Sequence, residues 1–303
     1  MRLLPVDYLL ALYNLLMIGV WTPLAPTLST ARWMIVVHLV GLGLVWLLAR
    51  GPVSESGVVR AVREVYPILW LMVFWRELGI HCELVGSAPN DTLLAAVDRS
   101  LLGVNLSAVW APTMSMGWFS ELMQLVYFSY YVAFVGLVLY LLVRGNRETA
   151  RDVTLRVSAV YVACFIVYAI APTIGPMAMF PRFSGEGVHG LFRTLNDALQ
   201  ASGDAAGTAF PSTHVAGAIT LAWLAWRHCP RWCAWLVTAV AVGVAPATIY
   251  TQNHFLVDAV AAVALAFWLQ GYGVPALQGA TRARLVPTLG RPATVPKSEP
   301  EVA

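Results

Sequence analysis

Charged side chains are scarce in this sequence, in which Asp, Glu, Lys and Arg make up 12% of 303 residues. Lysine is nearly absent, because Lys297 near the carboxyl end is the only one, and the net charge is only +3. Polar stretches long enough to fold alone are missing too, since the longest are 81–117, 172–209 and the segment from 278. This composition excludes a separate soluble domain, and no nucleic-acid partner is expected.

Apolar runs dominate the chain instead, with 59% hydrophobic residues and a mean hydropathy of +0.69. A helix of about 20 apolar residues crosses the roughly 30 Å of hydrocarbon in a bilayer. Eight runs approach that length, at 6–21, 34–48, 65–80, 119–143, 153–171, 215–226, 232–249 and 255–272. The pattern predicts an all-α, polytopic membrane helical bundle with about eight transmembrane helices. The first run lacks a small-residue cleavage pattern, so we expect it to stay as an anchor.

Most of the loop arginines fall in alternate loops, which predicts the orientation in the membrane because cytoplasmic loops retain Lys and Arg. They follow the second, fourth, sixth and eighth runs, as Arg50, Arg60, Arg63, Arg144, Arg147, Arg151, Arg227, Arg231, Arg282, Arg284 and Arg291. Both termini are therefore predicted to be cytoplasmic in a plasma membrane. The beginnings of the sixth and eighth runs are then extracytoplasmic.

Cysteine is also rare, with four residues in all. Only Cys82 is predicted on the oxidising side, which argues against a structural disulfide. Cys229 and Cys233 flank a short turn beside His228. Two arginines crowd that turn and a fourth ligand is missing, so we expect no metal site there.

Two further polar regions interrupt the apolar runs. The stretch 93–109 carries Asp98 and Arg99, with Asp91 just before it, and is too polar to span, which predicts an interfacial or re-entrant helix. The segment 175–208 is rich in glycine and leads directly into Phe-Pro-Ser-Thr-His at Phe210 to His214. We expect this segment to be a loop that leads into a functional site.

The string at residues 210–214 has the features of a helix start that binds an anion. Pro211 suits the first turn of a helix, and Ser212 and Thr213 supply hydroxyls and free N–H groups there. His214 lies in the same turn, so its imidazole would reach a phosphate held by those N–H groups. Alternatively, His214 hydrogen-bonds a neighbouring helix.

A second string, His254-Phe-Leu-Val-Asp258, begins the last apolar run. Its His and Asp are four residues apart, hence on one helix face and able to pair. A carboxylate on one ring nitrogen leaves the other nitrogen free as a base or nucleophile. The alternative is a buried ion pair that fastens helices. An ionisable side chain in an apolar segment is costly, so a partner is expected in either case.

Pro-Ser-x-His followed about forty residues later by His-x3-Asp resembles the type 2 phosphatidic acid phosphatase superfamily of membrane lipid phosphatases and phosphotransferases. The resemblance implies a six-helix core at 64–273 with two additional helices at 1–50. The cytoplasmic tail at 279–303 is rich in Pro, Thr and Arg without apolar periodicity, so we expect it to be disordered. The resemblance also implies that His254 is the nucleophile forming a phosphohistidine, that Asp258 orients it and that His214 protonates the leaving oxygen.

The sequence departs from the ordinary phosphatase pattern at two places. Ala247 and Thr248 stand where that pattern has Ser-Arg, and its Lys with Arg-Pro seven residues later is missing. The chain is more similar to the branch with inositol phosphorylceramide synthases and other inositolphosphotransferases, through Ala-Pro-Thr-Ile-Gly-Pro at 171–176 and Tyr-Thr-Gln-Asn-His at 250–254.

These missing cations leave phosphate charge that other groups must neutralise. Arg182 and Arg193 are the first candidates, and Arg76 follows. Each of them is alternatively a snorkelling anchor at the membrane edge. Glu121 and Tyr127, early in the fourth run, are expected to fasten helices by hydrogen bonds. Alternatively, they reach a polyol or the bundle interior.

These features predict a lipid phosphotransferase or phosphatase at the extracytoplasmic face. It uses His254, His214 and Asp258 as catalytic residues and Ser212, Thr213, Arg182 and Arg193 for phosphate, without metal or cofactor. Its partners are a phospholipid or lipid phosphate and, for a transferase, a sphingolipid acceptor. A metal-dependent phosphohydrolase built on the two histidines and the aspartate is one alternative. A non-enzymatic transporter or scaffold is another, although no repeat typical of transporters is present.

Overall fold

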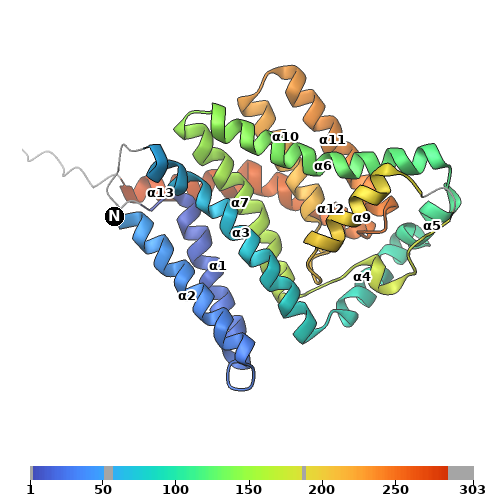
Figure 1. Ribbon diagram of the computed structural model, residues 1–303, viewed down its shortest axis with the longest axis horizontal. Helices are drawn as coiled ribbons and strands as arrows, with labels where there is room; N and C mark the ends of the chain where they lie inside the picture. The colour runs from blue at the N-terminus through green and yellow to red at the C-terminus, as the bar shows by residue number, and fades with distance from the viewer. Residues whose placement is uncertain (1–2, 51–56, 186–188, 286–303) are drawn as a thin grey trace, which may run out of the picture.

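A computed structural model describes residues 3–50, 57–185 and 189–285 as a bundle of helices without β-strands (Figure 1). The helices follow one another as α1 (Pro5–Trp21), η1 (Thr22–Leu24), α2 (Ser29–Arg50), α3 (Gly57–Val85), α4 (Ala88–Leu102), α5 (Leu106–Thr113), α6 (Gly117–Arg144), α7 (Arg147–Ile170), α8 (Pro176–Met179), α9 (Leu191–Gly203), α10 (Thr213–His228), α11 (Arg231–Tyr250), α12 (Leu256–Trp268), η3 (Leu269–Gly273) and α13 (Val274–Leu285). This confirms the predicted all-α polytopic class.

Six helices of the described chain are long and apolar enough to cross a membrane. They are α1 with η1, α2, α6, α7, α11 and the continuous helix Leu256–Thr281. The pair α4 and α5, bent by 64°, would make a seventh if it counts as one span. That bend agrees with the interfacial or re-entrant helix predicted at 93–109.

Two of the eight predicted spans, 65–80 and 215–226, form α3 and α10 but are not among the six. Helix α10 has only 16 residues, and α3 carries charged side chains at Arg76 and Glu77. Both are held by packing inside the protein, since α3 lies against α7, and α10 contacts α6, α7, α11 and α12.

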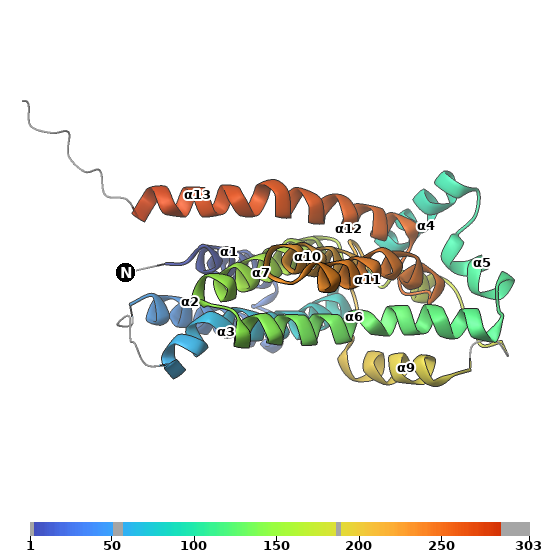
Figure 2. The same ribbon diagram turned by 90° about the horizontal axis from the view of Figure 1, so that it is seen from above.

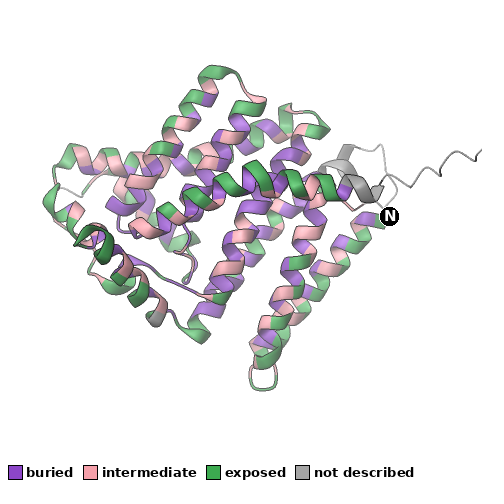
Figure 3. Cartoon of the chain, turned by 180° about the vertical axis from the view of Figure 1, so that it is seen from behind, coloured by how far each residue is buried: buried purple, intermediate pink, exposed green. Residues whose placement is uncertain are grey.

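Helix α7 forms the centre of the bundle. Of its apolar window 72% is buried, against 28% for α6, because α7 contacts α1, α3, α6, α10 and α13. Figure 2 shows α12 and α13 along one face of the protein and α6 along the other, with α7 and α10 between them. Buried residues gather in the middle of this bundle and exposed ones lie on its outer faces (Figure 3).

The two amino-terminal helices form a hairpin in which α1 packs on α7 and α3. Glu77 of α3 accepts hydrogen bonds from Trp21 and His38, which fastens the hairpin to the bundle through buried polar groups. At the other end of the chain α13 continues to Leu285, so the tail predicted from 279 begins with helix. Residues 286–303 lie outside the described residues. All four cysteines have free thiols.

Helix α4 holds two other segments in place through buried carboxylates. Asp98 accepts the N–H groups of Leu256 and Val257 at 3.0 and 2.9 Å, which caps the first turn of α12. Asp91 accepts the N–H of Gly175 at 2.7 Å. Gly175 has φ +88°, and a Cβ there would lie 3.1 Å from the carbonyl oxygen of Asn253, so glycine permits this close approach.

The Asp98 cap gives a first test of the fold. Asp98→Ala leaves two N–H groups of α12 unpaired, so we expect the free energy of unfolding to fall by about 1–2 kcal/mol. Thermal unfolding in detergent measures this change, with Arg99→Ala at the adjacent exposed position as the control. Equal melting temperatures for Asp98→Ala and Arg99→Ala would contradict the capping role.

Candidate active site

Two histidines from separate parts of the chain meet inside the bundle. His214 lies in the first turn of α10, and His254 lies in the turn between α11 and α12. The Nε2 atom of His254 is 3.4 Å from Nδ1 of His214, within hydrogen-bond distance. His254 is only 3% exposed. The helical hairpin of α10 and α11 therefore brings together the two strings that the sequence separates by forty residues.

The carboxylate of Asp258 lies on the other side of the His254 ring. Its Oδ2 atom is 3.4 Å from Nδ1 of His254 and accepts the Phe255 N–H at 2.8 Å. Asp258 thus caps α12 and faces the histidine, at the spacing expected for residues four apart. The Nδ1 atom has no hydrogen-bond partner among the described residues. Burial lowers the pKa of His254 to about 4, which keeps its imidazole neutral at pH 7.

Tyrosines of α6 surround His214 on its remaining sides. The hydroxyls of Tyr127 and Tyr131 each lie 3.0 Å from Nε2 of His214. The Tyr130 ring packs edge-on against the imidazole with centroids 5.1 Å apart. Gly217 gives Tyr130 its place, because a Cβ at Gly217 would lie 2.6 Å from the Tyr130 hydroxyl. These contacts fix the orientation of the His214 ring.

Sequence reasoning overlooked this tyrosine cluster. The sequence predicts that Tyr127 fastens helices, with contact to a polyol or the bundle interior as the alternative, and gives no role to Tyr131. Their spacing of four residues, which places both hydroxyls on one face of α6, was the available signal. Glu121 does fasten helices, because its carboxylate accepts the N–H groups of Phe192 and Arg193 at the start of α9.

The start of α10 is tied to α12. Ser212 is fully buried, its Oγ accepts the Val215 N–H at 3.3 Å, and its own N–H donates to the carbonyl of Asp258 at 3.2 Å. Tyr168 donates to the carbonyl of Pro211. Thr213 is 4% exposed and lines the same cavity as His214. In this structure the Ser212 hydroxyl serves as a helix cap.

The two candidate arginines meet at one carboxylate. Arg182 donates to Asp197 at 2.6 Å, and Arg193 donates to the same side chain at 2.8 Å. Arg182 also donates to Gln200, whose amide donates in turn to Asn253 at 2.8 Å and to the Tyr127 hydroxyl at 3.4 Å. One side chain therefore links Arg182 to neighbours of both histidines.

The Nε atom of Arg182 is buried without a hydrogen-bond partner among the described residues. A buried unpaired donor of this kind is costly and available to a ligand. Arg76, in contrast, donates to the Ser202 carbonyl at 2.7 Å and so fastens α3 to the end of α9. Of the three arginines proposed from the sequence, Arg182 has the closest connection to the histidine pair.

A cavity of about 340 Å³ reaches His214 from between α3, α6, α7 and α9. Its lining is largely apolar and aromatic, with Ile68, Leu71, Met72, Trp75, Tyr130, Tyr131, Phe134, Val135, Tyr161, Phe165, Leu199, Ser202, Gly203, Asp204, Thr213 and His214. Asp204 is the acidic residue of this lining. Burial raises its pKa to about 6, and the charge of Arg182 opposes that shift.

The ionisable side chains of the site are not arranged as a set of metal ligands among the described residues. No group of three or more His, Cys, Asp or Glu side chains in the described part of the chain is placed to hold a metal ion. His254 and Asp258 face each other and do not converge on a common point with His214. His228, which the sequence placed beside two cysteines, is hydrogen-bonded to Asp152.

The chain matches no curated protein and no solved structure. Residues 92–271 match the PAP2 superfamily, and this segment makes up more than half of the chain. It contains both histidines, Asp258, Arg182 and Arg193, together with the tyrosine cluster of α6. The resemblance to that superfamily is therefore confirmed. With its long apolar helices, the chain belongs to the PAP2 superfamily of phosphatases and phosphotransferases as a multi-pass membrane enzyme of phosphoryl transfer.

Proposed function

We propose that this enzyme transfers the phosphoryl group of a membrane lipid through a phosphohistidine on His254. In the first step Nε2 of His254 attacks phosphorus, and His214 gives a proton to the departing oxygen as the phosphorus–oxygen bond breaks. In the second step His214 takes the proton of water or of an alcohol, whose oxygen attacks the phosphohistidine and restores His254. Water gives a phosphatase, and an alcohol gives a transferase.

The approach of His254 Nε2 to His214 Nδ1 at 3.4 Å is the observation that carries this proposal. It places the nucleophilic nitrogen next to the residue proposed to supply the proton, with Asp258 behind the nucleophile. A phosphoryl group bonded to Nε2 needs room between the two rings, so we expect the His214 ring to shift away from His254 on substrate binding and to keep its contacts with Tyr127 and Tyr131.

Arg182 is proposed as the cation that replaces the missing motif residues. Positions 247 and 248, where the ordinary phosphatases have Ser-Arg, hold Ala and Thr side chains that are fully buried. The free Nε of Arg182 and its link to Asn253 through Gln200 support this role. Arg193 would hold Asp197 and thereby orient Arg182.

The aromatic cavity beside His214 supports a lipid substrate, since its walls match an acyl or isoprenoid chain better than a sugar or nucleotide. The arginine distribution supports an active site at the extracytoplasmic face with both termini cytoplasmic. The missing cations and the motifs at 171–176 and 250–254 favour an inositolphosphotransferase-like reaction. Incubation of the enzyme with labelled phosphatidylinositol, with and without ceramide, and with phosphatidic acid distinguishes the transferase reaction from the phosphatase reaction.

Trapping the intermediate tests the two histidine roles. p-Nitrophenyl phosphate has a leaving group that needs no proton, so His214→Asn should still form the phosphoenzyme but release it slowly. We expect ³²P to accumulate on His254 in His214→Asn, to turn over in the wild type and to be absent in His254→Asn. Quenching in alkali and peptide mapping locate the label.

Activity that persists in His254→Asn, or label on another residue, contradicts this mechanism. Activity that disappears on exhaustive chelation and returns with a divalent metal would favour the metal-dependent alternative instead.

The pKa of His254 predicts an unusual pH profile. Burial disfavours the imidazolium, so the nucleophile stays unprotonated until the pH falls to about 4. We expect kcat/KM for a phosphodiester lipid, which does not titrate in this range, to fall below pH 5 and not near the ordinary histidine value of about 6.5. Asp204→Asn removes the cavity carboxyl group whose pKa burial raises to about 6, and it serves as the control. A midpoint near 6.5 in both proteins contradicts the prediction.

Arg182→Gln tests the proposed phosphate cation. Because the cation acts on charge in the transition state, we expect kcat/KM to fall about 10²- to 10³-fold. Arg76→Gln is the matched control, since Arg76 fastens α3 to α9 and should change kcat/KM less than about threefold. Similar losses in both variants, with unchanged melting temperatures, would contradict the assignment of Arg182.

A further inference from the structure

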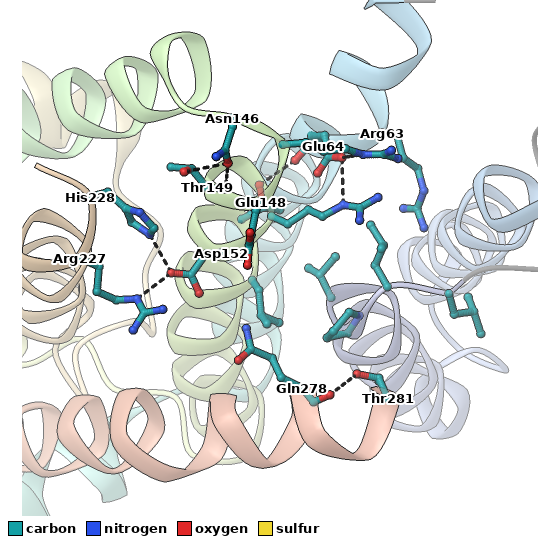
Figure 4. A pocket seen from close by; sticks show the side chains of 18 residues that line it. Arg63, Glu64, Asn146, Glu148, Thr149, Asp152, Arg227, His228, Gln278 and Thr281 are labelled. Carbon is teal, nitrogen blue, oxygen red and sulfur yellow. Dashed lines mark hydrogen bonds and ion pairs between the residues drawn. The ribbon is translucent and has the colours of Figure 1, made fainter. Parts of the chain in front are cut away.

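A second pocket, which unlike the first has many polar residues in its lining, lies at the opposite end of the bundle from the histidines. It has a volume of about 730 Å³ and is formed by the first residues of α1, the turn before α7 and parts of α3, α7, α10 and α13 (Figure 4). Helix α10 connects the two ends, with His214 in its first turn and Arg227 in its last, about 20 Å apart at 1.5 Å per residue. This pocket is therefore separate from the catalytic site.

Three arginines of this pocket are held through the Nε atom alone. Arg147 and Arg151 each donate through Nε to one oxygen of Glu64, at 3.2 and 3.1 Å. Arg227 donates through Nε to Asp152 at 3.0 Å. These three side chains are 45%, 39% and 49% exposed, whereas Glu64 and Asp152 are 6% and 8% exposed. The buried carboxylates thus orient arginines whose terminal nitrogens have no hydrogen-bond partner among the described residues.

A structural ion pair in the same pocket has a different geometry. Arg63 binds Asp7 with both terminal nitrogens, one to each carboxylate oxygen, and is only 12% exposed. Arg156, outside the pocket lining, is 4% exposed and donates through Nε to Asp152 and through a terminal nitrogen to Gln270. Both of these buried arginines therefore use terminal nitrogens to fasten helices. Among the described residues, the terminal nitrogens of Arg147, Arg151 and Arg227 have no such partner, which leaves them available to a ligand.

The surroundings of these three guanidinium groups indicate the kind of ligand. The guanidinium fork matches the geometry of phosphate and carboxylate oxygens. Asn146, Thr149 and His228 add hydrogen-bonding groups, and Leu3, Leu4, Val6 and Leu155 add an apolar wall. Basic pockets between helices at the cytoplasmic side of membrane proteins bind anionic lipid head groups. The arginine distribution of the whole chain predicts the cytoplasmic side for this end.

We propose that Arg147, Arg151 and Arg227 form a binding site for a phosphate-bearing anion, separate from the catalytic histidines. The chemistry is shared by the head group of an anionic phospholipid and by a free phosphate. A lipid would stabilise the contacts among α3, α7 and α10, because the pocket joins these helices.

Thermal unfolding of the full-length protein in a neutral detergent tests this site. Dioleoyl phosphatidylglycerol, dioleoyl phosphatidylcholine and inorganic phosphate are titrated separately, and the shift in melting temperature gives an apparent affinity. We expect phosphatidylglycerol to raise the melting temperature and Arg147→Gln/Arg151→Gln/Arg227→Gln to lower its affinity at least about tenfold. Arg144→Gln, at the exposed end of α6 outside the pocket lining, is the matched control.

Two further variants keep the test decisive. Arg147→Lys/Arg151→Lys preserves the charges beside buried Glu64 but removes the forks, so it should fold and still bind more weakly than wild type. Arg182→Gln should leave the phosphatidylglycerol-induced shift in melting temperature unchanged, which distinguishes binding at this pocket from anion binding at the histidines. A shift with inorganic phosphate as large as that with phosphatidylglycerol identifies a soluble anion as the ligand. No shift in the wild type, or equal shifts in wild type and the triple variant, overturns the proposal.

Discussion

The first turn of α12 is the point on which the catalytic arrangement depends. Its N–H groups have no water available inside an apolar bundle, so buried carboxylates must accept them. Asp98 from α4 and Asp258 from α12 itself provide these acceptors. Because Asp258 also faces His254, one interaction begins the helix, fixes the turn before it and aligns the histidine with His214. The carboxylate of Asp258 thus serves both the fold of α12 and the alignment of His254.

Elsewhere in the site, burial also makes polar side chains serve both the fold and the chemistry. Each polar group inside the bundle needs a partner, and the partners form a connected network from Arg182 through Gln200 to Asn253 and Tyr127. The network places a cation near the histidines although the chain lacks the lysine and arginines of the ordinary phosphatases. At the opposite end of the bundle, buried Glu64 and Asp152 also have partners. The arginines that they hold have terminal nitrogens without a hydrogen-bond partner among the described residues.

The sequence predicts the helical membrane class and the pairing of His254 with Asp258, because helix periodicity and the cost of charge in lipid are local rules. The joint role of His214 and His254 follows from the resemblance to the superfamily. The cap that Asp98 makes on α12 could not be predicted, since the partners are 158 residues apart. The contacts of Gln200 are hidden for the same reason, whereas the four-residue spacing of Tyr127 and Tyr131 is a local signal. Helices α3 and α10, predicted as spans, are not among the six helices of the described chain that are long and apolar enough to cross a membrane, and both pack against α7.

The stereochemical course at phosphorus tests the central claim most directly. A phosphohistidine mechanism makes two in-line displacements, so a lipid phosphate with an isotopically chiral phosphoryl group should pass it to an alcohol acceptor with net retention of configuration. Phosphorus NMR of the product determines the configuration. Net inversion would show a single displacement by the acceptor and would contradict a covalent intermediate on His254.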